Sequence, residues 1–292
     1  MNEHMFLQDL HSRALPYGSS MVDGFDINIS PYSKDVLNLV INALPSNGYR
    51  HWQLEESFRD YIQAALWDLV RGELYLEIEY FRSPEDPSGR PIAFRIELLQ
   101  REFVTKRWGK YRYLSQVGAV DDNSQRWSSK PLHPNNLLVA SLPRGLKREL
   151  RHTLRVMSAS DREARVMTDF TTGAHGSESG FDFGTFQLKS HDIVLRASKA
   201  TGWTGRGLLA EGLLDPAKAW RAIQFARLTV KLREIATQGL NDAINRAGMR
   251  IGFEAELTLS KVLTEDHLDA LENDLEAGTR PIEEMFSPKA SS

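Results

Sequence analysis

The stretch LEESFRDYIQAALWDLVRGELYLEIEYFRSPEDPSGRPIAFRIELL, residues 54–99, decides the fold class because its hydrophobic period changes partway along it. Over 53–71 the apolar residues recur every three or four positions, which predicts an amphipathic helix. Gly72 follows, where a helix C-terminal cap is expected. Apolar alternation over 74–81 predicts a strand, and the proline-rich run 83–91 predicts a turn into a second strand over 92–98. The expected fold is α+β, a helix followed by an antiparallel meander.

On the N-terminal side, residues 1–30 are polar and rich in Gly, Ser and Asp, which predicts an irregular arm. Ser30 or Ser33 is expected to cap a helix that runs to about Leu44. On the C-terminal side of the meander, 111–117 is a third candidate strand, and 118–143 is expected to be loop.

In the second half of the chain, the spacing of apolar residues predicts helical pieces over 146–157 and 159–168 and one long helix from Asp215 to Arg246. At 1.5 Å per residue the long helix would measure roughly 45 Å. Short strands are expected over 181–188, 192–196 and 251–259, a mobile loop over 171–180, and a break at GWTGRG, 202–207. Thr264 is expected to begin an acidic helix.

These elements suggest four consecutive segments, which we expect to be the parts of the molecule. They are an N-terminal arm, 1–30; a helix-and-sheet region, 31–143; a helical and short-strand region, 144–214; and the long helix, strand and acidic helix, 215–292.

Composition excludes several classes of protein. The 292 residues include 41% hydrophobic and 26% charged side chains, which is typical of a globular protein able to bury a core. The absence of cysteine rules out disulfides, thiol nucleophiles and cysteine-ligated zinc, and fits a reducing compartment. The N-terminal segment does not resemble a signal peptide, and no apolar run is long enough for a membrane helix.

The net charge of −3 hides an uneven distribution. Residues 144–165 contain seven Lys or Arg against three acids, and 218–250 contain seven against two. Residues 265–284 contain eight acids and one arginine. Solvated helix faces are one interpretation; the other is a polyanion-facing middle and an acidic end that repels or binds a partner.

Motifs for catalysis are weak. GWTGRG matches no phosphate-binding loop, and the histidines, including His175, lack the spacing of a zinc site. Asp182 followed by Gln187 and Lys189 has some likeness to metal-dependent nucleases, in which carboxylates bind Mg²⁺ and a lysine orients water, although an ordinary hairpin explains it as well. We expect no catalytic residue, no metal site and no cofactor.

Aromatic side chains beside basic ones offer a further possible contact with nucleic acid. Trp203 and Trp220 flank basic residues, and each is either a base-stacking platform or a core anchor.

The order of the pieces resembles the portal proteins of tailed bacteriophages. The likeness lies in the 54–99 segment, in FQLKSHDIVLRASKATGWTGRGLL (186–209), and in the long helix with MRIGFEAELTLSKVLTEDHLDALENDL (249–275). These resemble the family's wing segment, the strand and loop that lead to a long stem-type helix, and a strand followed by a final helix. Leu195 departs from the family's usual histidine, and the chain is shorter than most portals.

The resemblance implies a structural, non-enzymatic subunit of a homo-oligomeric ring, expected to be a dodecamer, at one vertex of the capsid. Duplex DNA would pass through the ring without sequence reading during packaging and ejection. The partners implied are capsid, terminase and head–tail connector proteins, with no membrane, in the virion and in the host cytoplasm during assembly.

Within the ring, the expected DNA-channel or interface residues are the basic side chains of the long helix: Lys218, Arg221, Arg227, Lys231 and Arg233. The acidic helix is expected to meet a basic 144–165 face on the neighbouring subunit. Two alternatives stay open: a metal-dependent nuclease or other nucleic-acid-processing enzyme around Asp182 and Lys189, and a host-encoded interaction module.

Overall fold

The computed structural model describes residues 2–16, 24–45, 53–117, 126–173, 191–205 and 215–279. The chain is of mixed helix and strand, as predicted, with its strands in three small antiparallel sheets. It divides into two compact units: residues 1–14, 143–231 and 263–292 form unit 1, and residues 15–142 and 232–262 form unit 2. The expected division into four consecutive segments stays a prediction.

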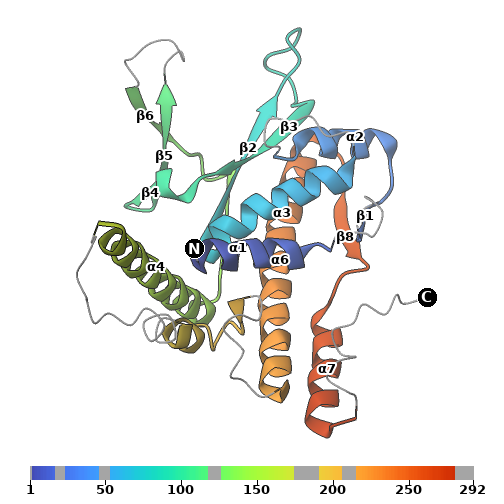
Figure 1. Cartoon of the computed structure of the whole chain (residues 1–292). Helices are drawn as coiled ribbons and strands as arrows, with labels where there is room; N and C mark the ends of the chain where they lie inside the picture. The colour runs from blue at the N-terminus through green and yellow to red at the C-terminus, as the bar shows by residue number, and fades with distance from the viewer. Residues whose placement is uncertain are drawn as a thin grey trace. The chain divides into compact units, whose positions relative to one another are not determined.

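Unit 2 is built around the sheet β3-β2-β7, in which β2 is central (Figure 1). Its strands are β2 (Glu73–Phe81), β3 (Ala93–Leu99) and β7 (Leu137–Ser141). One face of β2 presents Leu74, Leu76 and Ile78, each at most 1% exposed, and α3 (Leu54–Val70) packs against this strand. The helix, glycine, strand, turn and strand predicted over 53–98 are confirmed.

The C-terminal part of the long helix α6 (Asp215–Ile251) also lies against this sheet. A Cβ atom on Gly239 would come within 3.3 Å of the Ala140 Cβ and within 4 Å of Leu74 and Leu76. Glycine therefore allows the helix backbone to approach the strands closely. The Tyr61 hydroxyl on α3 donates a hydrogen bond to the Ala236 carbonyl on α6 at 2.7 Å, so α3 and α6 are joined directly.

Two smaller sheets complete unit 2. The order β4-β5-β6 is formed by β4 (Val104–Arg107), β5 (Lys110–Val117) and β6 (Arg126–Pro131), and β1 (Asp26–Ser30) pairs with β8 (Glu256–Ser260). A short helix, α2 (Lys34–Ala43), follows β1 and confirms the helix predicted to run to about Leu44; Ser33 occupies its N-cap position but makes no side-chain capping hydrogen bond. The prediction of loop over 118–143 is wrong where it covers β6 and β7, and β5 joins β4 and β6 rather than extending the β2–β3 pair.

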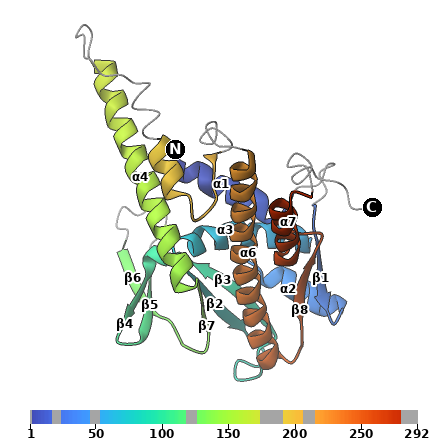
Figure 2. The same cartoon turned by 90° about the horizontal axis from the view of Figure 1, so that it is seen from below.

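Unit 1 contains α1 (Asn2–Ala14), α4 (Arg144–Gly173), a helix over 191–197, the N-terminal part of α6, and α7 (Glu265–Ala277). Its core includes Phe6 of α1, whose ring lies 5.6 Å from Trp203 and 5.9 Å from Phe225 on α6, measured between centroids. Figure 2 shows α4 and α6 as long, uninterrupted helices.

Three predictions for unit 1 need correction. The expected N-terminal arm is helical over 2–14 because Phe6, Leu7 and Leu10 are buried on one side of α1, and it ends in a strand, β1. The two expected helical pieces are one helix, since Ser158 and Ser160 lie within α4 without breaking it. Residues 192–196 are helical rather than extended.

The remaining predictions for the C-terminal half are confirmed in part, and the strand expected over 181–188 lies outside the described residues. The long helix is confirmed and extends to Ile251, and Thr264 caps α7 by accepting a hydrogen bond from the His267 amide. The last strand, β8, is shorter than expected. Within the described residues, no helix combines the length and apolar character needed to cross a bilayer.

Candidate nucleic-acid interface

Helix α4 has a narrow buried face. Leu150, Thr153, Met157 and Ser160 follow one another at intervals of three, four and three, and none is more than 7% exposed. The Thr153 hydroxyl donates to the Ala197 carbonyl at 2.8 Å, which ties this face to the helix over 191–197. The orientation of α4 about its own axis is therefore fixed by side chains spaced to form one stripe.

The opposite side of α4 carries a row of exposed arginines, named here the α4 arginine row. At 100° per residue these positions fall within about 60° of one another around the helix, and the row extends over about 27 Å. Its members lie at intervals of four, three, four and seven: Arg144, Arg148, Arg151, Arg155 and Arg162.

These guanidinium groups are available to an external anion. In the part of the chain that the structure describes, no carboxylate lies within ion-pairing distance of Arg144, Arg148, Arg151 or Arg155. Among the described residues, Arg162 donates to the Ser158 carbonyl of its own helix, at 3.3 Å. Arginine binds phosphate oxygens in a planar, bidentate geometry, so a row of this kind suits a repeating phosphate backbone.

The basic side chains that the sequence indicated on α6 behave differently, and two of them are buried. Arg221 is 8% exposed and donates to the Leu195 carbonyl at 2.9 Å and to the Trp203 carbonyl at 3.4 Å. Arg233 is 3% exposed. Burial lowers the pKa of both guanidinium groups. Because neither side chain reaches the surface, both are removed from the set of expected DNA contacts.

Two more of the predicted α6 residues are paired with the acidic helix α7. Arg227 contacts Asp269 at 2.6 Å and Glu272 at 2.7 Å, and Lys231 lies 3.5 Å from Glu265. Hydrogen bonding to Glu272 is the main reason that the pKa of Arg227 is raised. Three acids of α7 therefore have basic partners within unit 1, and the expected contact of this helix with a neighbouring subunit stays a prediction.

The other residues singled out from sequence have mixed outcomes. Lys218 is half-buried. Trp203 is 2% exposed and donates from Nε1 to the Asp9 carboxylate at 2.9 Å, so it is a core anchor and the base-stacking interpretation is wrong for it. Trp220 is 38% exposed. Asp182, Gln187, Lys189, His175 and most of the expected loop 171–180 lie outside the described residues.

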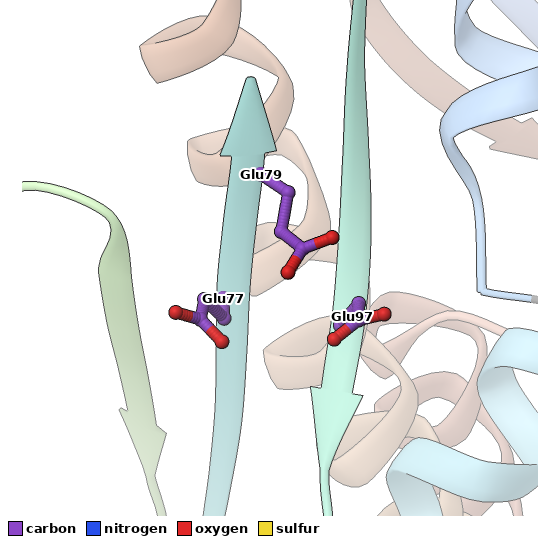
Figure 3. Close-up of side chains that lie close together, drawn as sticks. All are labelled: Glu77, Glu79 and Glu97. Atoms are coloured by element: carbon purple, nitrogen blue, oxygen red, sulfur yellow. The ribbon is translucent and has the colours of Figure 1, made fainter. Parts of the chain in front are cut away.

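A carboxylate cluster in unit 2 was not predicted. Glu77 and Glu79 on β2 and Glu97 on β3 bring carboxylate oxygens within 4.8 Å of one another (Figure 3). Lys130 of β6 lies 3.1 Å from Glu77 and 3.6 Å from Glu79, and Arg95 pairs with Glu97. These two cations offset part of the charge of the three carboxylates, and the alternating acids on adjacent strands were the only signal of the cluster in the sequence.

Comparison with known proteins adds no family assignment. No protein-family model matches the chain. No curated protein shows significant similarity to it.

Proposed function

We propose that this chain is the subunit of a portal-like ring that conducts duplex DNA and docks the capsid, a packaging terminase and head–tail connectors. The α4 arginine row is the observation that carries the proposal. Passage of DNA of any sequence requires contacts with phosphates rather than with base edges. Exposed arginines with no carboxylate partner among the described residues meet that requirement.

The order of elements gives further support. The amphipathic helix α3, Gly72, β2, the proline-rich turn and β3 follow one another as the resemblance to the portal wing segment implies. The long helix α6, the strand β8 and the acidic helix α7 follow one another as its last segment implies. This support is architectural, because none of these elements carries a catalytic motif.

The positions of the basic groups revise which residues would contact DNA. The surface proposed for duplex DNA is the α4 arginine row, in place of the α6 set that the sequence suggested. Arg221 and Arg233 are buried, and Arg227 and Lys231 hold α7. Lys218 and the exposed Trp220 remain candidates for an interface between subunits.

Electron microscopy of the purified chain, with mass photometry over a range of concentrations, tests the ring. We expect closed rings with a central hole wide enough for duplex DNA and a mass of about twelve subunits. A particle that stays monomeric at the highest concentration would contradict the ring and leave the phosphate-binding surface to be explained by another function.

A further inference from the structure

The small sheet β4-β5-β6 has one largely exposed face, named here the outer face. Directly paired residues of an antiparallel sheet share a face, and the faces alternate along each strand. The register pairs Thr105 with Arg112, Arg107 with Lys110, and Gln116 with Trp127. The outer face therefore carries the side chains of Thr105, Arg107, Lys110, Arg112 and Trp127 together with those of Leu114 and Ser129.

The other face of this sheet is structural. Tyr111 and Tyr113 of β5 pack against a buried cluster that includes Tyr75, Leu99 and Leu137. The Tyr75 and Tyr111 ring centroids lie 6.0 Å apart. Because the inner face holds the sheet in place, the exposure of the outer face is a property of the fold.

The outer face is strongly basic. Residues 104–117 contain four Lys or Arg and no acid. Three of these cations, Arg107, Lys110 and Arg112, are exposed on the outer face, and Arg112 is oriented by hydrogen bonds to the Ser129 hydroxyl at 2.8 Å and carbonyl at 3.2 Å. The cations therefore form a short row that can follow a phosphate backbone.

A strained tryptophan forms the tip of the β4–β5 hairpin. Trp108 is 89% exposed and has a φ of 50°, in the left-handed region that favours Gly, Asn and Asp, and Gly109 follows with a φ of 76°. The guanidinium carbon of Arg107 lies 4.8 Å from the Trp108 ring centroid. A large aromatic side chain here adds strain without burial, which is typical of a residue kept for function.

A second tryptophan lies on the outer face itself. Trp127 of β6 is 56% exposed, and its ring lies 5.3 Å from that of Phe103, which supports it from one side. The short polar side chains of Thr105 and Ser129 lie among the aromatic and basic groups on this face. The combination of open aromatic rings, cations and short polar groups is the chemistry that sheet surfaces use to hold unpaired bases.

We propose that the outer face of β4-β5-β6 and its hairpin tip bind single-stranded nucleic acid. Trp127 and Trp108 stack on bases while Arg107, Lys110 and Arg112 contact phosphates. Duplex DNA would offer the phosphates but not the base faces, because these are stacked inside the helix. A membrane surface would require a larger apolar area than two isolated tryptophans and Leu114 provide.

This inference is independent of the portal proposal, because it concerns a surface of unit 2 and an unpaired strand. The α4 arginine row is assigned to duplex DNA, and the outer face to single strands. Ring formation is required for neither binding activity, so each assignment stands or fails by itself.

Fluorescence anisotropy of a labelled oligothymidylate of about fifteen nucleotides, titrated with the full chain, tests the proposal. Trp127→Ala and Trp108→Ala should each weaken binding roughly 5- to 100-fold, because one stacked base is lost in each variant. Trp127→Phe should retain most of the affinity. A triple Ser substitution at Arg107, Lys110 and Arg112 should lower the salt slope by about 2.

Matched variants separate stacking at this face from general effects. Trp67→Ala removes another exposed tryptophan, whose ring has the Arg71 guanidinium carbon 4.4 Å from its centroid, and it should change the affinity less than about twofold. Trp108→Gly should weaken binding as Trp108→Ala does while raising the melting temperature, because glycine adopts the left-handed turn without strain. Circular dichroism confirms that each variant is folded.

Two results would overturn the proposal. In the first, Trp108→Ala and Trp127→Ala bind the oligothymidylate within about twofold of the unmodified chain. In the second, vesicles of anionic phospholipid bind the chain in a Trp108-dependent manner while the oligothymidylate does not bind. If substitutions in the α4 arginine row weaken binding of duplex DNA and leave binding of the oligothymidylate unchanged, the assignment of duplex DNA to α4 and of single strands to the outer face is supported.

Discussion

Helices α4 and α6 are similarly basic in sequence, and they use their charge in opposite ways. The arginines of α4 lie opposite its buried stripe and face outward, whereas Arg221 and Arg233 of α6 are buried and Arg227 is paired with two carboxylates. The number of cations on a helix therefore does not indicate a binding surface. A cation is available to an external anion only where it lies away from the buried face of its helix and where the fold places no acid beside it.

The largest effect that would test this contrast is on duplex DNA. Replacing Arg148, Arg151 and Arg155 with Ser should weaken binding of a duplex about 100- to 1000-fold at low salt and lower the salt slope by about 2.7, because three phosphate contacts are lost. Filter binding or anisotropy over a series of salt concentrations measures both quantities.

The control for this prediction is the paired set on α6. Arg227→Ser with Lys231→Ser removes two cations from the other helix and should change duplex affinity only a few-fold. Equal losses in the two sets of variants would break the comparison, because the charge of α6 would then be as available as that of α4.

A smaller effect is expected on stability. Arg221→Met should lower the free energy of unfolding by about 2–3 kcal/mol, because the buried Leu195 and Trp203 carbonyls lose their donor. Arg148→Met, at an exposed position of α4, should change it by less than about 0.5 kcal/mol. Urea denaturation followed by circular dichroism gives both values, and equal losses would show that exposure does not separate the two helices.

The carboxylate of Asp161 on α4 holds the start of α1, and its contribution to the free energy of unfolding should depend on pH. It accepts hydrogen bonds from the amides of Asn2 at 2.9 Å and Glu3 at 3.3 Å, at the start of α1. Burial raises the pKa of Asp161, but hydrogen bonds from the start of α1 outweigh burial and leave it below the usual value. Asp161→Asn should cost about 1 kcal/mol at neutral pH.

Because the pKa of Asp161 is lowered in the folded chain, its contribution to stability decreases in acid. The stabilisation by Asp161 is fully present above the unfolded-state pKa of about 3.9 and is lost as the pH falls through the lower folded-state value. Urea titrations at several pH values should therefore show the difference between Asp161→Asn and the unmodified chain shrinking below about pH 4. Glu149→Gln, at an exposed site of the same helix, is the control, and a difference that grew in acid would contradict the assignment.

The smallest effect concerns the contact between α6 and α7. Arg227→Met should weaken docking of α7 by about 0.5–1 kcal/mol, because partly exposed ion pairs contribute little. Hydrogen exchange of the α7 amides measures this docking, and added salt should reduce protection in the unmodified chain more than in the variant. Lys231→Met, which removes a longer and more exposed pair, should have a smaller effect. No change with salt would show that apolar packing, not charge, holds α7.

The parts of the fold that were predictable are those whose signal is local. The helix over 54–70, Gly72 and the hairpin over 73–99 follow from a change of hydrophobic period and from turn residues within one stretch. The long helix and the cap at Thr264 are likewise local features. Such elements are recognisable because each residue choice agrees with its neighbours.

The missed elements depend on distant partners. Helix α1 has a short apolar stripe among polar residues, and it is stabilised by rings that lie nearly 200 residues away, such as Trp203. The strands β6 and β7 are stabilised by pairing with β5 and β2, which the sequence around 118–143 does not reveal.

The candidate sites divide in the same way. The basic character of 144–165 was visible in the sequence, but the arginine row was not, because it requires the two expected helical pieces to be one continuous helix, α4. The loss of Arg221 and Arg233 to the interior, and of Arg227 to α7, was not visible because the groups that surround them come from other elements. The outer face of β4-β5-β6 required the strand register, which places Arg107, Lys110 and Trp127 on one side.

In the two-stranded sheet β1–β8, the edge of β8 away from β1 is paired at Leu257 by one side chain of α6. Asn241 is 6% exposed, and its amide accepts from the Leu257 N–H at 2.9 Å and donates to the Leu257 carbonyl at 3.0 Å. It thereby occupies the two backbone groups with which a further strand would pair. An unprotected strand edge invites association with other chains. Without the Asn241 amide, the Leu257 N–H and carbonyl would be left buried with no partner, so this one side chain completes the hydrogen bonding of a strand that has no neighbouring strand on that side among the described residues.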